Sequence, residues 1–401
     1  MRVYMFKKII KSQDYKLIIA LVVLCLIGLV MVYSSSMITS LTRYHVPSDY
    51  FYKKQMGALL VGFFLFFIAA FLIPYKVFKE KKIIILILVI SFLLLGVVLV
   101  LGHTAGGAKS WIKIGPLRIQ PLEIAKLAVI VYLASAFTKK QEYINELTRA
   151  FIPPISIVVL ICFLLAAQPD YGGVLLMLGT VAALVFCSGI SVKTGFKIFF
   201  ITLVGTGLMI FVLWITGSVD KILSPTRLGR FTGFIDPFAD PDGKGYQLVN
   251  SYLAIGTGGL GGEGLGKGVQ KFGYLPESHT DFIMAVIAEE LGYGGVIVVL
   301  GLLFFIILQG LLIAKRCSDP FGSLLAIGIS TMIGIQTFVN LGAVSGILPI
   351  TGVTLPFVSY GGSSITLLLF STGVLANISM VDKFKKKYKQ NATKPTHLES
   401  V

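Results

Sequence analysis

The sequence predicts an all-α membrane protein of about ten transmembrane helices, with one long extracellular loop between spans 7 and 8. Three observations predict this fold class. First, 55% of the 401 residues are hydrophobic and only 13% are charged, which argues against a set of soluble domains. Second, apolar stretches long enough to cross about 30 Å of hydrocarbon as helices recur along the chain. Third, Lys and Arg gather in alternate connecting segments.

The apolar stretches determine the expected spans. The first has an apolar core too long for a cleaved signal peptide, so we expect it to stay as a helix. The two shortest, 121–137 and 153–168, carry charged or polar residues, so we expect both to be buried among other helices. The expected spans are 17–36, 56–73, 83–102, 121–137, 153–168, 172–189, 195–216, 282–313, 322–346 and 362–381.

The positions of the basic residues explain the formal charge of +16. Lys and Arg are frequent in the segments on the side of the amino terminus, whereas 169–171 and 347–361 contain none. This bias predicts that both termini are cytoplasmic. The basic tail suits anionic membrane lipids, and we predict no nucleic-acid partner. The expected organisation is a cytoplasmic segment 1–16, a membrane domain 17–381 with its outer loop at 217–281, and a basic cytoplasmic tail 382–401.

Charged residues inside an expected span require an explanation, because an unpaired charge in hydrocarbon costs at least about 2.5 kcal/mol. Glu123 and Lys126 are one helical turn apart and can pair, with Arg118 just above them. Two interpretations stay open: an ion pair that joins helices, and an anchor for an anionic headgroup. In the preceding segment, Trp111 suits either the interfacial aromatic belt or stacking on a substrate.

Two other outer connections are rich in glycine and polar residues. In the first, Asp170 suits either a helix N-cap or a shared outer cavity, and Gly172 lets another backbone come close. The second, 349–364, reads as irregular backbone, which at membrane depth requires a cavity. Polar groups thus concentrate at one membrane face, which favours a site at the outer leaflet over a transport path.

The middle of the long loop is rich in glycine. Residues 248–255 are apolar enough for a helix that lies on the membrane. Residues 256–268 resemble a phosphate-binding loop, but Gly268 stands where a magnesium-holding Ser or Thr is needed. The glycines therefore predict a tight backbone scaffold, with amides that contact a pyrophosphate as the alternative. Arg230 is a basic candidate in the same loop.

The end of the long loop is the most informative stretch. Asp281 falls where polar loop becomes apolar helix, with Glu277 and His279 close by. Its carboxylate suits either a helix cap or a partly desolvated general base that takes a proton from a substrate hydroxyl. Glu289 follows on nearly the same helix face, about 12 Å deeper. There we expect an inter-helix contact or a cavity wall instead of lipid.

The order of these motifs resembles the SEDS family of bacterial cell-wall proteins (shape, elongation, division and sporulation) over essentially the whole chain. The motif sequences are most similar to those of the division branch, and the sporulation and elongation branches are near relatives. Leu122 and Tyr171 depart mildly from the family pattern. The resemblance rests on Lys109-Ser-Trp-Ile112, Arg118-Ile-Gln-Pro-Leu-Glu123, Gln168-Pro-Asp170, Gly245-Tyr-Gln247, Tyr274-Leu-Pro-Glu-Ser-His-Thr-Asp-Phe282, Glu289-Glu-Leu-Gly292 and Leu355-Pro-Phe-Val-Ser-Tyr-Gly-Gly362.

The resemblance implies a peptidoglycan glycosyltransferase that polymerises lipid II at the outer face of the bacterial cytoplasmic membrane during septal wall synthesis. A class B penicillin-binding protein and other division proteins are the implied partners. Asp281 stands at the position of the family's catalytic aspartate. Its carboxylate would deprotonate the acceptor hydroxyl, with inversion at the donor sugar. The substrate-binding residues expected from the resemblance or from their positions are Lys109, Trp111, Arg118, Glu123, Lys126, Asp170, Arg230, Glu277, His279 and Glu289.

Other functions and a metal requirement stay open at this level. No cofactor is certain: a divalent cation, Mg²⁺ or Mn²⁺, would assist at a pyrophosphate, but no ligand cluster stands out in the sequence. The four cysteines lie in three spans and one inner segment and suggest no metal site. The alternatives to the glycosyltransferase are a lipid II flippase or transporter and a non-enzymatic division scaffold.

Overall fold

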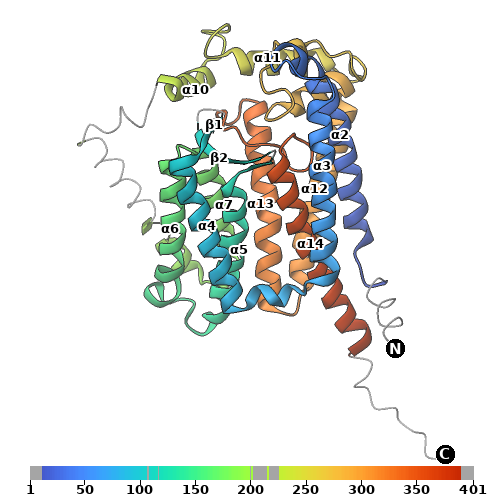
Figure 1. Ribbon diagram of the computed structural model, residues 1–401. Helices are drawn as coiled ribbons and strands as arrows, with labels where there is room; N and C mark the ends of the chain where they lie inside the picture. Colours follow the sequence, from blue (N-terminus) through green and yellow to red (C-terminus); the bar gives the residue numbers. More distant parts are fainter. Residues whose placement is uncertain are drawn as a thin grey trace, which may run out of the picture.

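A computed structural model describes residues 11–105, 108–115, 117–198, 200–201, 215 and 225–389 as a bundle of long apolar helices (Figure 1). Within these described residues, eight helices are long and apolar enough to cross a membrane, and α7 is a shorter apolar helix. The predicted all-α membrane fold is confirmed, although most of the expected span 195–216 lies outside the described residues. The helices are α2 (Tyr15–Thr42), α3 (Tyr50–Phe67), α4 (Lys81–Leu101), α5 (Pro121–Lys139), α6 (Ile152–Ala167), α7 (Tyr171–Phe186), α12 (Ile283–Arg316), α13 (Pro320–Val344) and α14 (Gly362–Phe384).

Short irregular helices join or extend the spans. The π-helical turns η1 (Ile68–Leu72) and η6 (Lys385–Lys389) follow α3 and α14, and η4 (Leu147–Phe151) precedes α6. The 3-10 helices η2 (Tyr75–Lys79) and η3 (Gln141–Tyr143) lie in two of the connections.

The bundle has two distinct ends. At one, which we call the terminal end, α2 begins and α14 finishes (Figure 1). An ion pair of 3.0 Å between Lys383 and Asp14 joins these two helices there. At the other, the loop end, lie α10 (Pro225–Ile235) and α11 (Tyr246–Gly258) (Figure 1).

The expected burial of the two shortest spans is right for one and wrong for the other. Helix α5 is surrounded by α4, α7 and α13, and 78% of its membrane-length window is buried. Helix α6, by contrast, packs mainly on α4, α5 and α7, and only 33% of its window is buried. Its side chains Val159, Leu160 and Phe163 are exposed. The polar residues of the expected span 153–168 therefore did not predict burial. A helix needs only one apolar face to lie against lipid.

A small antiparallel sheet interrupts the helical pattern between α4 and α5. Strands β1 (His103–Ala105), β2 (Ala108–Ile114) and β3 (Leu117–Ile119) pair in chain order. The register places His103 opposite Trp111 and Lys113 opposite Arg118. The alternating stretch of the sequence thus forms a compact hairpin at the loop end, next to α5.

The glycine-rich segment wraps closely around the first part of α12. A Cβ at Gly258 would lie 1.9 Å from the Ala288 carbonyl oxygen, and one at Gly262 would lie 2.4 Å from that of Glu290. Gly292, with φ of 63°, breaks the helical path inside α12. These contacts show why glycine is required there, and they agree with the predicted backbone scaffold. The expected helix at 248–255 is present as part of α11.

Candidate functional site

Asp281 lies in the turn that leads into α12, at the loop end of the bundle. The N-cap position of α12 is Phe282, one residue later than the helix-cap interpretation of Asp281 requires. Asp281 is half-buried, so its carboxyl is partly desolvated while it stays accessible. Asp281 is therefore part of the turn and not the cap of α12.

Three consecutive carbonyl groups in this turn receive donors from the last third of the chain. The Tyr360 amide donates to the His279 carbonyl at 2.9 Å, and the Ser359 hydroxyl donates to that of Thr280 at 2.6 Å. Asn340 Nδ2, on α13, donates to the carbonyl of Asp281 at 2.7 Å. The backbone at Asp281 is thereby fixed to α13 and to the 345–361 connection.

The 351–353 segment connects Asp281 with the start of α7. Gly352, with φ of +75°, lies against the acid, because a Cβ there would be 3.7 Å from Asp281 Oδ2. On the other side, a Cβ at Gly172 would be only 2.8 Å from the Thr351 carbonyl oxygen. Asn340 Nδ2 also donates to the Val353 carbonyl at 2.7 Å. The expected close backbone approach at Gly172 is therefore confirmed.

Asp170 is the N-cap of α7, as one of its two interpretations requires. Its Oδ1 accepts a hydrogen bond of 2.8 Å from the Gly173 amide. Burial raises the pKa of Asp170, and the Gly173 amide and the charge of Lys126 oppose that rise. The other oxygen, Oδ2, is buried without a hydrogen bond of good geometry in the described part of the chain. The cap thus leaves half of the carboxyl available for a second role.

Buried polar atoms without partners surround the Asp281 turn. Among the described residues, Asn340 Oδ1 and Thr351 Oγ1 make no hydrogen bond, and Asp170 Oδ2 makes none of good geometry, although the Gln120 side chain interacts with the Asp170 carboxyl. Such groups are rare in folded proteins because each costs about 1–3 kcal/mol. All three belong to the elements that meet at Gly172 and Gly352. The arrangement suits a ligand with hydroxyl and amide groups.

His279 and Glu277 lie in the same turn but face different surroundings. The His279 ring is buried against Phe51 and Tyr360, with ring centroids 4.5 and 5.8 Å away. Burial lowers the pKa of His279 to about 4, so the ring is neutral at pH 7. Glu277, in contrast, is partly exposed and lies 3.7 Å from Arg43. His279 therefore shapes the turn, whereas Glu277 is accessible.

The predicted pairing of Glu123 and Lys126 is confirmed. Their side chains are 3.0 Å apart, with exposures of 6% and 1%. Lys126 also donates to Gln336 Oε1 of α13 at 3.0 Å, and Gln336 Nε2 donates to the Thr354 carbonyl at 3.1 Å. These are the contacts of an ion pair that joins helices and supports the 345–361 connection. A role in anchoring a headgroup stays a prediction.

The other predicted site residues lie outside the Asp281 turn, in the small sheet and in α10. Lys109 donates to the carbonyls of Leu99 and Val100 at 3.0 Å each, where it caps the end of α4. Trp111 is half-buried in β2, and Arg118 is exposed in β3. Arg230 belongs to α10, but its side chain is outside the described residues.

Glu289 is buried and holds loop backbone. It accepts hydrogen bonds from the amides of Val269 at 2.7 Å and Gln270 at 3.1 Å. Glu289 is therefore buried instead of facing lipid, as expected, but its partner is the backbone of the long loop and not another transmembrane helix. At the end of the glycine-rich segment, the Gly266 amide belongs to the group that was considered as a pyrophosphate site. It donates instead to the carboxylate of Glu290.

The described residues do not form a metal site of the usual kind. They contain no group of three or more His, Cys, Asp or Glu side chains that could hold a metal ion. Mg²⁺ is often bound by one or two carboxylates together with substrate phosphates. A requirement for Mg²⁺ or Mn²⁺ therefore stays a prediction.

A family model matches most of the chain. The model described as cell cycle protein, which covers FtsW, RodA and SpoVE, matches residues 15–384. The chain belongs to the FtsW/RodA/SpoVE family. Among curated members, the probable peptidoglycan glycosyltransferase FtsW of Bacillus subtilis (strain 168) is 52% identical over 389 residues, which are 96% of this chain and 95% of that protein. The stage V sporulation protein E of the same organism is 39% identical, covering 93% and 98%.

Solved structures of family members have the same fold. A chain of a peptidoglycan synthase complex, described as coordinating polymerization and crosslinking, has a TM-score of 0.72 at 28% identity. The match covers 92% of this chain and 98% of that one. The rod shape determining protein RodA of Thermus thermophilus has a TM-score of 0.64 at 29% identity, covering 92% and 96%. The chain is thus a multi-pass membrane protein of a bacterial family.

Sequence reasoning missed several residues of the site. Asn340, Thr351 and Gln336 each contact or flank a predicted residue but come from another part of the chain. A polar amide in an otherwise apolar span is the available signal for Asn340 and Gln336. Thr351 lies in the 349–364 segment that the sequence marked as irregular backbone beside a cavity, but its hydroxyl was not singled out because hydroxyls are common in connections.

Proposed function

We propose that this chain is a peptidoglycan glycosyltransferase that polymerises lipid II into glycan strands at the outer face of the cytoplasmic membrane. The single observation that carries the proposal is the turn at Asp281. Its carboxyl is half-buried, and the turn's backbone is held by Asn340, Ser359 and Tyr360. Family membership supports the reaction class, because relatives such as the Bacillus subtilis protein carry that activity in their names.

The Asp281 carboxylate acts as a general base. It takes the proton of the acceptor sugar hydroxyl, whose oxygen forms a bond to the anomeric carbon of the donor. The bond from that carbon to the pyrophosphate oxygen breaks, the electron pair leaves with the pyrophosphate, and the configuration inverts. Partial burial favours this role because the carboxylate is shielded from part of the bulk water while a substrate hydroxyl can still reach it.

The buried polar atoms around the turn suit the sugar part of such a substrate. Asp170 Oδ2, Thr351 Oγ1 and Asn340 Oδ1 are acceptors, and sugar hydroxyls and N-acetyl amides are donors. Arg118, exposed on β3, is a suitable counter-charge for the leaving pyrophosphate. Trp111 and Glu277 add accessible surface at the loop end.

The cellular setting follows from the same family. A class B penicillin-binding protein is the proposed partner, supported by the structural match to a complex that couples polymerization to crosslinking. Action at the division septum with other division proteins is supported by 52% identity to an FtsW protein against 39% to a sporulation protein. The charge bias of the connections supports a cytoplasmic position for both termini.

Purified complexes tested on lipid II decide the proposal. Asp281→Asn removes the base with little change in shape, so it should bind lipid II but lose polymerisation by about 100-fold or more. The matched control is Asp242→Asn, an exposed acid of the same loop, which should stay active. Full glycan synthesis by Asp281→Asn contradicts the proposal.

The other outcomes identify the alternatives. Equal accumulation of outer-leaflet lipid II in vesicles of the wild type and Asp281→Asn, without polymer in either, would indicate a flippase. Normal growth of cells that carry only Asp281→Asn would indicate a scaffold. Polymerisation with and without a chelator tests the divalent cation directly.

A further inference from the structure

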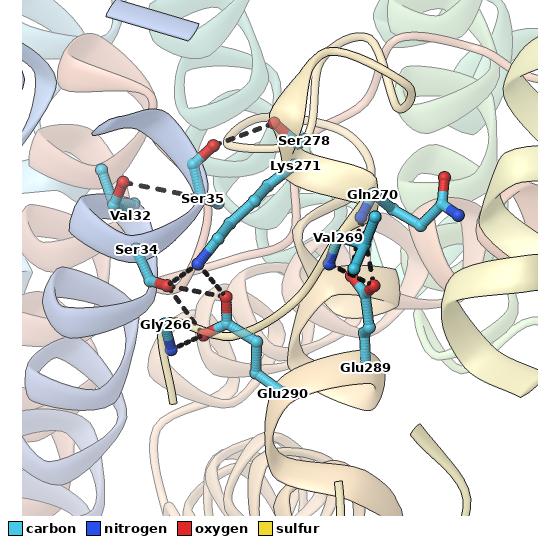
Figure 2. Close-up of polar contacts among 10 residues, drawn as sticks. All are labelled: Val32, Ser34, Ser35, Gly266, Val269, Gln270, Lys271, Ser278, Glu289 and Glu290. Carbon is cyan, nitrogen blue, oxygen red and sulfur yellow. Dashed lines mark hydrogen bonds and ion pairs between the residues drawn. The ribbon is translucent and has the colours of Figure 1, made fainter. Parts of the chain in front are cut away.

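Away from Asp281, a buried charge cluster joins three parts of the chain. Lys271 Nζ lies 2.7 Å from Glu290 Oε1, and both side chains have an exposure of 0%. Ser34 Oγ lies 2.7 Å from both carboxylate oxygens and accepts from Lys271 at 3.0 Å. We call these three residues the Lys271 cluster (Figure 2). They belong to the long loop, α12 and α2.

The cluster continues onto the loop backbone. The Gly266 amide donates to Glu290 Oε2 at 2.9 Å, while Glu289 holds the Val269 and Gln270 amides (Figure 2). A Cβ at Gly268 would lie 2.7 Å from Glu289 Oε2. Two adjacent acids of α12 thus hold one short loop segment, 266–271.

A second contact ties the same loop to α2 nearer to Asp281. Ser278 Oγ donates to the Ser35 carbonyl at 3.0 Å (Figure 2). Ser278 is three residues before Asp281, and Ser35 is next to Ser34 of the cluster. The loop between 271 and 278 is therefore fixed at both ends to adjacent residues of one helix, just before the proposed base.

Stability alone does not explain a charged cluster at this place. Desolvation offsets much of the attraction in a buried ion pair, and an apolar pair of similar volume often serves as well. What the ionic arrangement adds is direction, because Lys271 and Glu290 are satisfied only in one geometry. Because Lys271 and the Gly266 amide tie this loop to Glu290, the cluster would act on the reaction through the loop.

We propose that Ser34, Lys271 and Glu290 are positioning residues for Asp281. The cluster sets the path of the 266–281 segment, so that the carboxyl reaches the acceptor hydroxyl at the correct distance. This inference rests on the proposed function. Because a displacement of about 1 Å can cost about 100-fold in rate, even a small shift of this loop should be visible in kcat.

The test separates positioning from folding with a charge-neutral pair of changes. Either Lys271→Met or Glu290→Gln alone leaves a buried charge unpaired and should lower the melting temperature strongly. The double variant Lys271→Met/Glu290→Gln removes both charges, so its melting temperature should approach that of the wild type. Its kcat for lipid II polymerisation should still fall about 10- to 100-fold with KM nearly unchanged, because ground-state binding is retained.

A milder set covers the case in which the double variant does not fold. Ser34→Ala keeps both charges but removes the hydroxyl, so kcat should fall several-fold, and Ser34→Thr, which keeps the hydroxyl, should recover it. The matched control is Glu263→Gln/Lys267→Met, two exposed residues of the same loop, which should behave as the wild type.

Amide hydrogen exchange gives a readout besides activity. In the double variant, the amides of 266–281 should exchange faster while those of α13 stay protected. Wild-type kcat in both the double variant and Ser34→Ala would overturn the proposal. A double variant that recovers the wild-type kcat together with the wild-type melting temperature would overturn it as well. If the wild type itself makes no glycan, the proposed function fails, and exchange over 266–281 still shows whether the cluster orders the loop.

Discussion

Among the ion pairs of the described residues, the two with both side chains buried lie at the loop end, whereas pairs with an exposed member occur at both ends. At the loop end, the ion pairs Lys126–Glu123 and Lys271–Glu290 are buried and carry further hydrogen bonds to other elements. At the terminal end, a pair such as Arg149–Glu146 is exposed by 75% and 52%. Exposed pairs contribute little to stability, and their Lys and Arg serve to orient the protein in the membrane. Buried ones fix geometry.

Backbone packing differs in the same sense. At the loop end, Gly172 and Gly258 bring segments into direct backbone contact with Thr351 and Ala288. Farther along α12, a Cβ at Gly301 would meet nothing within 4 Å. A side chain at Gly172 or Gly258 would therefore collide with neighbouring backbone at the end of the bundle where the Asp281 carboxyl must be aimed. Three predictions test this comparison.

The largest difference should be between the ion pairs of the two ends. Lys126→Met leaves Glu123 buried without its partner, which should cost about 3–5 kcal/mol of stability. Arg149→Met at the terminal end should cost less than about 1 kcal/mol. Melting temperatures of the detergent-solubilised variants measure both. Equal losses would mean that burial of the pair does not distinguish the two ends.

A second difference should appear in the response to acid. The folded pKa of His279 is about 4, below the ordinary 6.5, so between these values the unfolded chain binds a proton that the folded chain does not. Stability should therefore fall as the pH drops from about 6.5 to about 4, by about 3 kcal/mol in all from this group. The melting temperature of His279→Asn should therefore depend less on pH over this range than that of the wild type.

The matched control for that measurement is His45→Asn. His45 is exposed, so its replacement should leave the pH dependence of melting as it is in the wild type. If the melting temperature of His279→Asn depends on pH as that of the wild type does, the burial of the His279 ring is not the cause of the loss of stability in acid.

The smallest effect should come from glycine packing. Gly172→Ala forces its methyl group against the Thr351 carbonyl, which should cost about 1–3 kcal/mol and reduce polymerisation through Gly352 and Asp281. Gly301→Ala should be neutral or slightly stabilising, since alanine favours a helix. Melting temperature and initial rate measure both. A stable, fully active Gly172→Ala variant would show that the 351–353 segment does not need this close contact.

Local patterns in the sequence determined what depends on near neighbours. Apolar runs predicted the described spans to within several residues at their ends, because crossing hydrocarbon requires length and hydrophobicity alone. The Glu123–Lys126 pair was predictable because three residues make about one helical turn. Asp170 as a cap followed from its place before a helix.

Only the tertiary structure decided which distant residues meet at the site. Nothing in the spacing pairs Asn340 with Asp281, 59 positions away, or Ser34 with Glu290, 256 positions away. The exposure of α6 was also not predictable, since which face meets lipid depends on its neighbours. Hydrophobicity dictates that a segment crosses the membrane, whereas the packing of helices and the wrapping of glycine-rich backbone decide which polar groups share one environment.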